Sequence, residues 1–165
     1  MANFFQDNPD LKFTLENLEL APISTLLEDD FKAAEKYETA PRDAADALDN
    51  YRRALDVVGE VCADRIEPRS RTVDLEGAKF IDGKVVYHPL TLQNLEDLTK
   101  AGVMGVMLGH EYGGLNFPVS VYTMMTEMVS RADASLQNLF GLQSIGETIC
   151  EFGSEEQREE FLPGF

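Results

Sequence analysis

The chain has 165 residues and carries 30 Asp and Glu against 14 Lys and Arg, which gives a net charge of −16 at pH 7. Its length suits one domain, and a hydrophobic fraction of 44% can build a core, so a disordered acidic tail is excluded. Binding to a phosphate backbone or an anionic lipid surface needs clustered Lys and Arg, so the charge also argues against nucleic acid as a partner.

The first part of the chain is expected to hold two short helices. They are separated by Ala21–Pro22, and the second opens with Thr25 and Glu28 at the spacing of a capping box. A segment this short cannot hold a core of its own. We therefore predict that residues 1–37 are an N-terminal extension that docks on a larger domain of residues 38–165.

A long amphipathic helix is expected after Thr39–Ala40–Pro41, since proline is tolerated in a first helical turn. Its apolar residues recur at steps of three and four, and they are Leu48, Tyr51, Leu55, Val58, Cys62 and Ile66. Pro68 should end this helix, because proline disrupts a helix interior.

A β-hairpin is predicted next, because Asp82–Gly83 stands between two β-rich arms within residues 79–87 and favours a type I′ turn. A helix should follow His88–Pro89 and end at Gly102 in a left-handed cap. Five glycines between residues 102 and 114 then predict an apolar loop.

The last part of the chain predicts three more helices. The first should begin with Asn116 as its cap and Pro118 in its first turn. Ser135 should cap the second, which is apolar on more than one side and ends at Gly153. A capping box at Ser154 precedes the third. The whole pattern predicts an all-α helical bundle with one small β-hairpin.

The spacing of the polar residues indicates no metal site and no activated nucleophile. Cys62 and Cys150 have no second Cys or close His beside them, so both are predicted to be buried free thiols. The glycine-rich segment fits neither common phosphate-binding pattern. Glu111 lies among glycines that would let the backbone approach a ligand, but a structural role in a tight turn is the simpler interpretation. His110 is expected to be a hydrogen-bonding residue of the loop.

The methionines other than Met1 all lie between Met104 and Met128. Flexible thioethers suit an adaptable apolar wall for a partner helix or an acyl chain. Ordinary core filling is the simpler interpretation of these methionines, and taken alone it is the favoured one.

Several motifs occur in an order typical of one family. They are Glu67-Pro68-Arg69, Gly102-Val103-Met104-Gly105, Glu111-Tyr112-Gly113-Gly114, Ser130-Arg131-Ala132-Asp133-Ala134-Ser135 and Phe152-Gly153-Ser154-Glu155-Glu156-Gln157 through Phe161-Leu162-Pro163. Together they resemble the N-terminal helical domain of acyl-CoA dehydrogenases over about residues 38–165. Residues 3–11 resemble the extension of a longer branch of that family, which includes enzymes for 3-methylthiopropanoyl-CoA.

The resemblance implies an FAD-dependent enzyme with three domains, of which a middle β domain and a C-terminal helical bundle are missing here. In such enzymes FAD lies between those two domains. A Glu of the C-terminal bundle removes the α-proton of the acyl-CoA while a hydride leaves the β-carbon for the flavin. The implied partners are an acyl-CoA substrate and electron-transfer flavoprotein. For this chain alone, the resemblance implies no catalytic residue, no bound FAD and no activity.

The resemblance also implies that the helix after Ala132–Ser135 forms one wall of the acyl pocket. The positions carried over are Leu136, Leu139, Phe140, Leu142 and Gln143. Bulk at these positions would limit the length of the acyl chain, and Phe140 suggests a short pocket.

A function of another class is the alternative: an independent acidic helical module that binds a protein partner through its Met-rich and Leu-rich faces without catalysis. Under the family interpretation, apolar surface meant for other domains predicts self-association through residues 119–152. Since no long apolar run and no secretory signal are visible, the sequence predicts a cytoplasmic protein without a membrane span.

Overall fold

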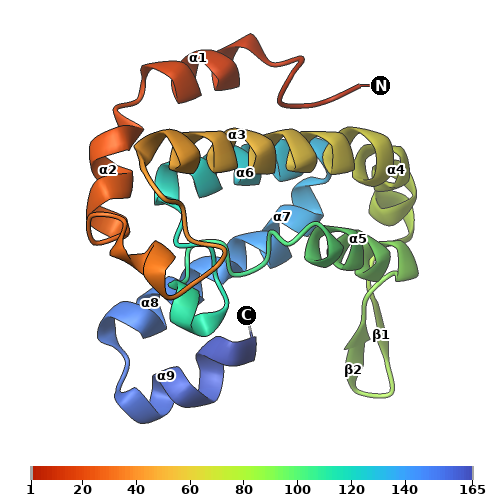
Figure 1. Ribbon diagram of the computed structural model, residues 1–165. Coiled ribbons are helices and arrows are strands. Elements are labelled where there is room, and N and C mark those ends of the chain that lie inside the picture. Colours follow the sequence, from red (N-terminus) through yellow and green to blue (C-terminus); the bar gives the residue numbers. More distant parts are fainter. Residues whose placement is uncertain (1, 165) are drawn as a thin grey trace.

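The computed structural model describes residues 2–164; Met1 and Phe165, which end the two predicted segments, lie outside the described residues. The helices are α1 (Pro9–Asn17), α2 (Leu20–Leu27), α3 (Ala44–Val61), α4 (Glu67–Glu76), α5 (Pro89–Lys100), α6 (Val119–Ala132), α7 (Ala134–Phe140), α8 (Ser144–Phe152) and α9 (Glu155–Phe161). The strands are β1 (Lys79–Ile81) and β2 (Lys84–Val86). The predicted helical bundle with one small hairpin is confirmed (Figure 1).

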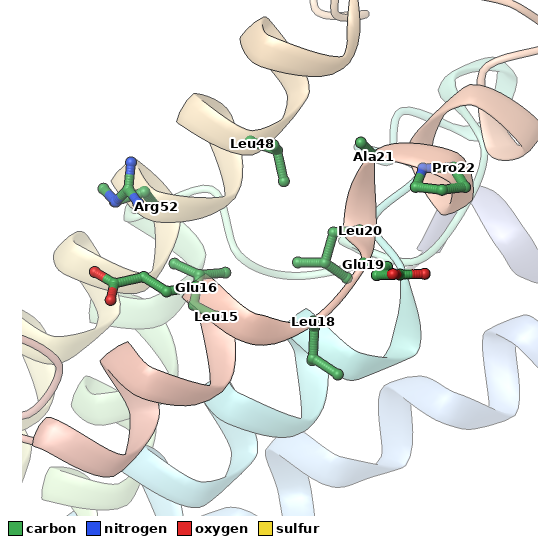
Figure 2. A pocket seen from close by; sticks show the side chains of 9 residues that line it. All are labelled: Leu15, Glu16, Leu18, Glu19, Leu20, Ala21, Pro22, Leu48 and Arg52. Carbon is green, nitrogen blue, oxygen red and sulfur yellow. The ribbon is translucent and has the colours of Figure 1, made fainter.

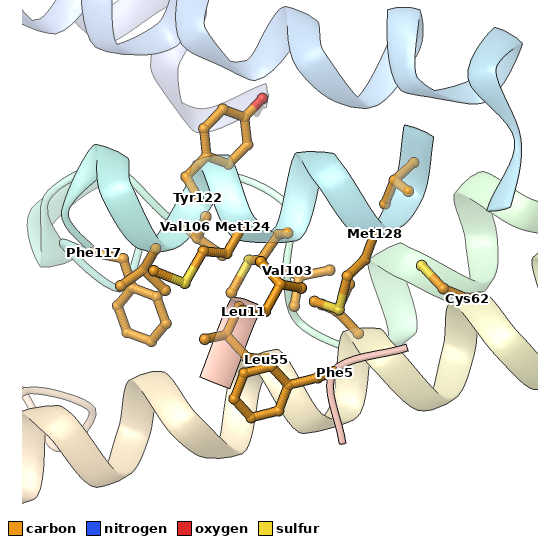
Figure 3. Packing of buried hydrophobic residues seen from close by; sticks show 14 of the residues in the cluster. Phe5, Leu11, Leu55, Cys62, Val103, Val106, Phe117, Tyr122, Met124 and Met128 are labelled. Carbon is orange, nitrogen blue, oxygen red and sulfur yellow. The ribbon is translucent and has the colours of Figure 1, made fainter. Parts of the chain in front are cut away.

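The core lies between α3 and α6, and α7 packs against α6. The predicted stripe of α3 is buried from Tyr51 through Cys62 to Ile66, while Leu48 is partly buried. On α6, the three methionines Met124, Met125 and Met128 are buried in the same cluster (Figure 3). The methionines of α6 therefore fill the core, as the simpler of the two interpretations had it.

The N-terminal segment joins this core. Phe5, Leu11, Leu15 and Leu20 are buried in the cluster that α3 and α6 form. The backbone N–H of Phe4 also donates to the carbonyl of Gly59 on α3, with an N···O distance of 3.1 Å. The segment thus docks on the bundle, while the boundary at residues 37 and 38 stays a prediction.

The second short helix begins earlier than predicted. Because α2 starts at Leu20, Ala21–Pro22 lies in its first turn, not between two helices. Thr25 is inside α2, and its hydroxyl donates to the carbonyl of Ala21 at 2.9 Å, so it caps nothing. The carboxylate of Glu28 is engaged by His110 far along the chain. The backbone of Asp29, Asp30 and Phe31 is left-handed, so the helix does not continue beyond α2.

Pro68 does not end the long helix. A π-helical turn at Cys62–Ile66 joins α3 to α4, and Pro68 occupies the first turn of α4, where its missing N–H is not needed. The start was also misplaced: Asp43 caps α3 with its carboxylate, so Pro41 lies ahead of the helix.

The hairpin and the cap of α5 form as predicted. Asp82 and Gly83 have φ angles of 51° and 78°, as a type I′ turn requires, and Gly102 has a φ of 71° just after α5.

Two other caps were assigned to the wrong residue. The side-chain amide of Asn116 donates to the carbonyl of Leu27 at 2.7 Å, so α6 begins after Pro118 without a side-chain cap. Asp133 caps the next helix in place of Ser135. The single apolar helix expected up to Gly153 is divided into α7, a 3₁₀ turn at Gly141–Gln143 and α8. The capping box of Ser154 in front of α9 is confirmed in both of its hydrogen bonds.

Candidate functional site

The predicted acyl-pocket wall is held in place at the start of α7 by Asp133. Its Oδ1 accepts the backbone N–H of Ser135 at 2.9 Å and of Leu136 at 3.2 Å. It also accepts the hydroxyl of Ser135 at 2.6 Å. Leu136 and Phe140 stand four residues apart on the resulting helix and are both 0% exposed. Both side chains therefore belong to the core that α7 shares with α6.

The C-terminal end of α7 is tied to α6 by Tyr122. Its hydroxyl donates to the backbone carbonyl of Phe140 at 2.9 Å, and the two rings lie 5.7 Å apart between centroids. Burial raises the pKa of Tyr122, so its phenol stays protonated at neutral pH and remains a donor. This contact sets the position at which α7 ends.

Gln143 connects the glycine-rich loop to the junction of α7 and α8. Its side-chain NH₂ donates to the carbonyl of Phe140 at 3.1 Å. Its side-chain oxygen accepts the backbone N–H of Gly105. Gln143 is buried, and its amide serves as both donor and acceptor here. The residue therefore has a positioning role that the sequence did not reveal.

Leu139 and Leu142 lie differently from the other three predicted wall residues. Leu139 is half-buried and lines a hollow of about 230 Å³ between α7, α4, α5 and the base of the hairpin. Leu142, in the 3₁₀ turn, is 48% exposed. The structure thus places Leu136, Phe140 and Gln143 inside the bundle and leaves Leu139 and Leu142 able to contact something beyond it.

An apolar stripe continues from this turn along α8. Its members recur at steps of three and four, and they are Leu142, Ile145, Ile149 and Phe152. Phe152 is 82% exposed, and Ile145 is also exposed. We call these four residues the α8 stripe. In the part of the chain that the structure describes, nothing buries its two ends.

His110 and Glu28 form a buried pair at another place in the fold. Their Nε2 and Oε2 atoms lie 3.0 Å apart, and the side chains are 3% and 1% exposed. The ring of Tyr37 stacks on His110, and Asn116 donates to Glu28 at 3.3 Å. This confirms that His110 is a hydrogen-bonding residue of the loop. No local pattern could have shown its partner, which is 82 residues away in sequence.

The cysteines carry no nucleophile. Burial raises the pKa of Cys62 to about 12. Cys150 is only partly buried, which corrects the prediction for that residue; burial and the nearby Glu111 carboxylate raise its pKa. Both thiols therefore stay protonated near neutral pH.

Within residues 2–164, no group of His, Cys, Asp and Glu side chains is arranged to hold a metal ion. Over the same residues, no helix combines the length and the apolar character that a membrane span needs.

The glycine-rich loop does not fit a dinucleotide cofactor. The N–H groups of Gly102, Gly105, Gly113 and Gly114 already donate to Thr99, Gln143, His110 and Gly109. A cradle for a diphosphate needs a row of such donors that face a ligand. The net charge of −16 adds repulsion toward phosphate. These four backbone donors of the loop are therefore not free to hold a diphosphate.

A second hollow, of about 550 Å³, lies where the junction of α1 and α2 meets α3 (Figure 2). Its lining is mostly aliphatic, and the charged side chains in it are Glu16, Glu19 and Arg52. All three side chains are exposed, so none lies in the desolvated surroundings that catalytic acids and bases use. The α7 wall and the α8 stripe remain the better candidates.

Comparison with known proteins gives one family. The family model described as "Acyl-CoA dehydrogenase, N-terminal domain" matches residues 49–165. The chain is 34% identical over 117 residues to 3-methylmercaptopropionyl-CoA dehydrogenase of Ruegeria pomeroyi, across 70% of this chain and 20% of that protein. It is 33% identical over 88 residues to probable acyl-CoA dehydrogenase FadE10 of Mycobacterium bovis and of Mycobacterium tuberculosis, across 50% of this chain and 14% of each relative. The matches thus span a fifth or less of these relatives.

Proposed function

The chain belongs to the acyl-CoA dehydrogenase family, and from this membership we propose that it is the N-terminal helical domain of a longer, FAD-dependent enzyme. That enzyme would remove hydrogen from the α and β carbons of an acyl-CoA thioester. The observation that carries the proposal is the family match over residues 49–165, and the helical architecture agrees with it. The chain would contribute one wall of the acyl pocket and no reacting group.

The five wall residues divide into two roles in this proposal. Leu139 and Leu142 are accessible and would contact the acyl chain or a neighbouring domain. Leu136, Phe140 and Gln143 are buried and would hold α7 and the 3₁₀ turn in position. A change at Phe140 would then act on the pocket through the place of α7 and not through direct contact with substrate.

The α8 stripe is proposed to be covered by the remaining domains of the longer protein. Its spacing marks one face of a helix, and Ile145 and Phe152 are exposed on it. Exposed apolar side chains gathered in this way are typical of an interaction surface. The relative from Ruegeria pomeroyi, of which the match spans only 20%, supports the presence of further domains.

The substrate proposed for the longer enzyme is a short acyl-CoA such as 3-methylthiopropanoyl-CoA, because the 34% identical relative from Ruegeria pomeroyi is named a 3-methylmercaptopropionyl-CoA dehydrogenase. FAD and electron-transfer flavoprotein are proposed as its cofactor and electron acceptor. The compartment is proposed to be the cytoplasm. The 165-residue chain alone is proposed to be inactive, since its loop does not fit the cofactor.

The test uses the longest open reading frame that contains this sequence. The purified product should oxidise acyl-CoA thioesters and show a flavin absorption band. In a series of thioesters of increasing length, kcat/KM should favour short chains. Replacing Leu142 with alanine should improve kcat/KM for an acyl chain one methylene longer by about fourfold, which corresponds to ~0.8 kcal/mol of burial.

Leu92→Ala is the matched control, because Leu92 is also an exposed leucine but lies on α5. An equal shift in both variants would remove the wall role from Leu142 and leave the family function standing. A product that neither binds flavin nor oxidises any acyl-CoA would contradict the enzyme itself and favour the acidic interaction module.

A further inference from the structure

A hollow that the proposed enzyme function does not use lies where α4 meets the junction of α6 and α7. Its volume is about 400 Å³, and residues of α4 and residues 130–135 line it. None of the five wall residues is among them. The lining includes three serines and four charged side chains, which are Arg71, Asp74, Arg131 and Asp133. Two cationic and two anionic groups therefore share one small hollow.

One carboxylate oxygen in this hollow has no partner. Asp133 is 7% exposed, and its Oδ1 accepts three hydrogen bonds at the start of α7. Its Oδ2 is buried and accepts no hydrogen bond from residues 2–164. A buried polar group normally has a partner, because without one it loses the hydrogen bonds that water would give it. The Oδ2 atom of Asp133 is therefore open to a hydrogen-bond donor from outside the chain.

The two arginines of the hollow are also unpaired. Arg71 and Arg131 are exposed, and the ion pairs of the described residues use other arginines. The guanidinium of Arg131 lies over the ring of Phe4, 4.1 Å from its centroid. Such a contact uses the face of the guanidinium and leaves the N–H groups at its edge available for a carboxylate. Arg131 is thus held in place before a ligand arrives.

The charges of the hollow select between classes of ligand. The two arginines and the two aspartates sum to zero, so an ion of either sign gains little net attraction there. The net charge of −16 on the whole chain also repels anions. A molecule that carries both signs on separate groups can satisfy both kinds of side chain at once. The lining therefore favours a small zwitterion over an inorganic anion.

We propose that this hollow binds a small zwitterion, an amino acid or a related molecule with one carboxylate and one ammonium group. Arg71 and Arg131 hold the carboxylate, since guanidinium groups bind carboxylates through paired N–H donors. The ammonium donates to Oδ2 of Asp133 and to the carboxylate of Asp74. Because Arg71 and Asp74 are exposed, their side chains can turn to admit the ligand. The site does not depend on the enzyme function proposed above.

A ligand in this hollow connects three elements of the fold. Arg131 lies in the last turn of α6, Asp133 caps α7, and Arg71 and Asp74 belong to α4. The unfolded chain does not hold these groups together, so the ligand binds the folded state and stabilises it by mass action. The melting temperature of the chain should therefore rise with the concentration of the zwitterion.

An NMR titration of the 165-residue chain with glycine, β-alanine and 4-aminobutyrate tests the site. These zwitterions differ in the separation of their two charges. At least one should shift the amide signals of residues 70–74 and 130–135 until they saturate. N-acetylglycine, which keeps only the negative charge, and ethylamine, which has only a positive one, should bind about tenfold more weakly or worse. Equal binding of either single-charge probe, or no saturation with any zwitterion, overturns the proposal.

Two variants test the assignment of the charges. Asp133→Asn keeps a side chain that can cap α7 but removes the negative charge, and Arg71→Gln removes a positive charge at an exposed position. Each should weaken binding of the best zwitterion by about tenfold, as expected for the loss of a charge-assisted hydrogen bond. Both should also remove the rise in melting temperature.

Arg52→Gln is the matched control, because Arg52 is also exposed but lines the hollow beside α1 and α2. It should bind the zwitterion like the wild type. Unchanged affinity in both Asp133→Asn and Arg71→Gln overturns the proposal, and so does an equal loss of affinity in Arg52→Gln. Circular dichroism of each variant verifies its helical content, and Arg71→Gln decides the matter if Asp133→Asn does not fold.

Discussion

Phe140 and Phe152 occupy two neighbouring helices and have opposite surroundings. Phe140, at the end of α7, is 0% exposed against α6, whereas Phe152, at the end of α8, is 82% exposed. The closed region around Phe140 also pairs its polar groups, as the bonds of Tyr122 and Gln143 show. The α8 stripe has apolar side chains without such an enclosure. Both regions contain large apolar side chains, and they differ in whether another part of the chain packs over those side chains.

The strongest way to break this comparison is to truncate both phenylalanines. Phe140→Ala should lower the free energy of unfolding by about 3–5 kcal/mol, because it leaves a cavity in the closed region. Phe152→Ala should change it by no more than ~0.5 kcal/mol, as for other surface positions. Urea unfolding of the two variants measures both values. Similar losses in the two would mean that α8 is already enclosed in solution.

The buried pair of Glu28 and His110 extends the comparison to polar side chains, one pair buried and one exposed. His110→Phe removes the partner 3.0 Å from a carboxylate that stays buried, so stability should fall by about 3 kcal/mol. Glu96→Gln breaks the exposed pair of Glu96 and Lys100, and its effect should be below ~1 kcal/mol. Chemical denaturation compares them. A small effect at His110 would show that Asn116 and solvent replace it.

Asp97 tests the ion pairs that connect α5 to α4 and to the π-helical turn before it. Replacing it with asparagine should cost about 2 kcal/mol at neutral pH, since hydrogen bonds from Arg65 and Arg69 at 2.9 and 2.7 Å lose their charged acceptor.

The pH dependence of this effect has a definite sign. Burial alone would raise the pKa of Asp97, but the hydrogen bonds from Arg69 and Arg65 outweigh burial, and the pKa lies below its ordinary value of 3.8. Its contribution is therefore complete above the unfolded pKa and is lost as pH falls through the lower folded value. Urea midpoints between pH 6 and pH 3 should converge for wild type and Asp97→Asn at the acid end. Parallel curves would contradict the ion-pair assignment.

The hydroxyl of Tyr122 provides the smallest effect. Tyr122→Phe removes one buried hydrogen bond to Phe140 and should lower stability by about 1 kcal/mol. Tyr87→Phe, at an exposed position, is the control and should be neutral. Thermal melts of both variants measure the difference. An unchanged melting temperature for Tyr122→Phe would indicate that another donor reaches the carbonyl.

Periodicity predicted the parts of the fold that depend on neighbouring residues. The stripe from Tyr51 to Ile66 is buried as expected, and Asp82–Gly83 forms the expected turn, since local sterics decide both. Pro68 misled the prediction because the π-helical turn before it lets helix resume at Glu67. That turn has no recognised sequence signal.

Long-range partners explain the other differences. Thr25 and Glu28 match a capping box in sequence, yet the carboxylate of Glu28 hydrogen-bonds to His110. Only the folded chain brings Glu28 and His110 together. Asp133 and Ser135 are both good caps by composition, and the packing of Leu136 against α6 decides between them. At the candidate site the resemblance pointed to the helix after Ala132–Ser135, and the role of that helix in an acyl pocket stays a prediction. The resemblance could not tell which of the five side chains point inward, because that depends on the 3₁₀ turn at Gly141–Gln143.

The π-helical turn at Cys62–Ile66 has a consequence for insertions and deletions. Each helical residue advances the chain by about 100° around its axis, so deleting one residue there would swing α4 through roughly a quarter of a circle. Arg69 would leave Asp97, and the hairpin that follows α4 would aim in a new direction. A homologue with an ordinary α-helical turn at this point should therefore carry its hairpin on another side of the domain.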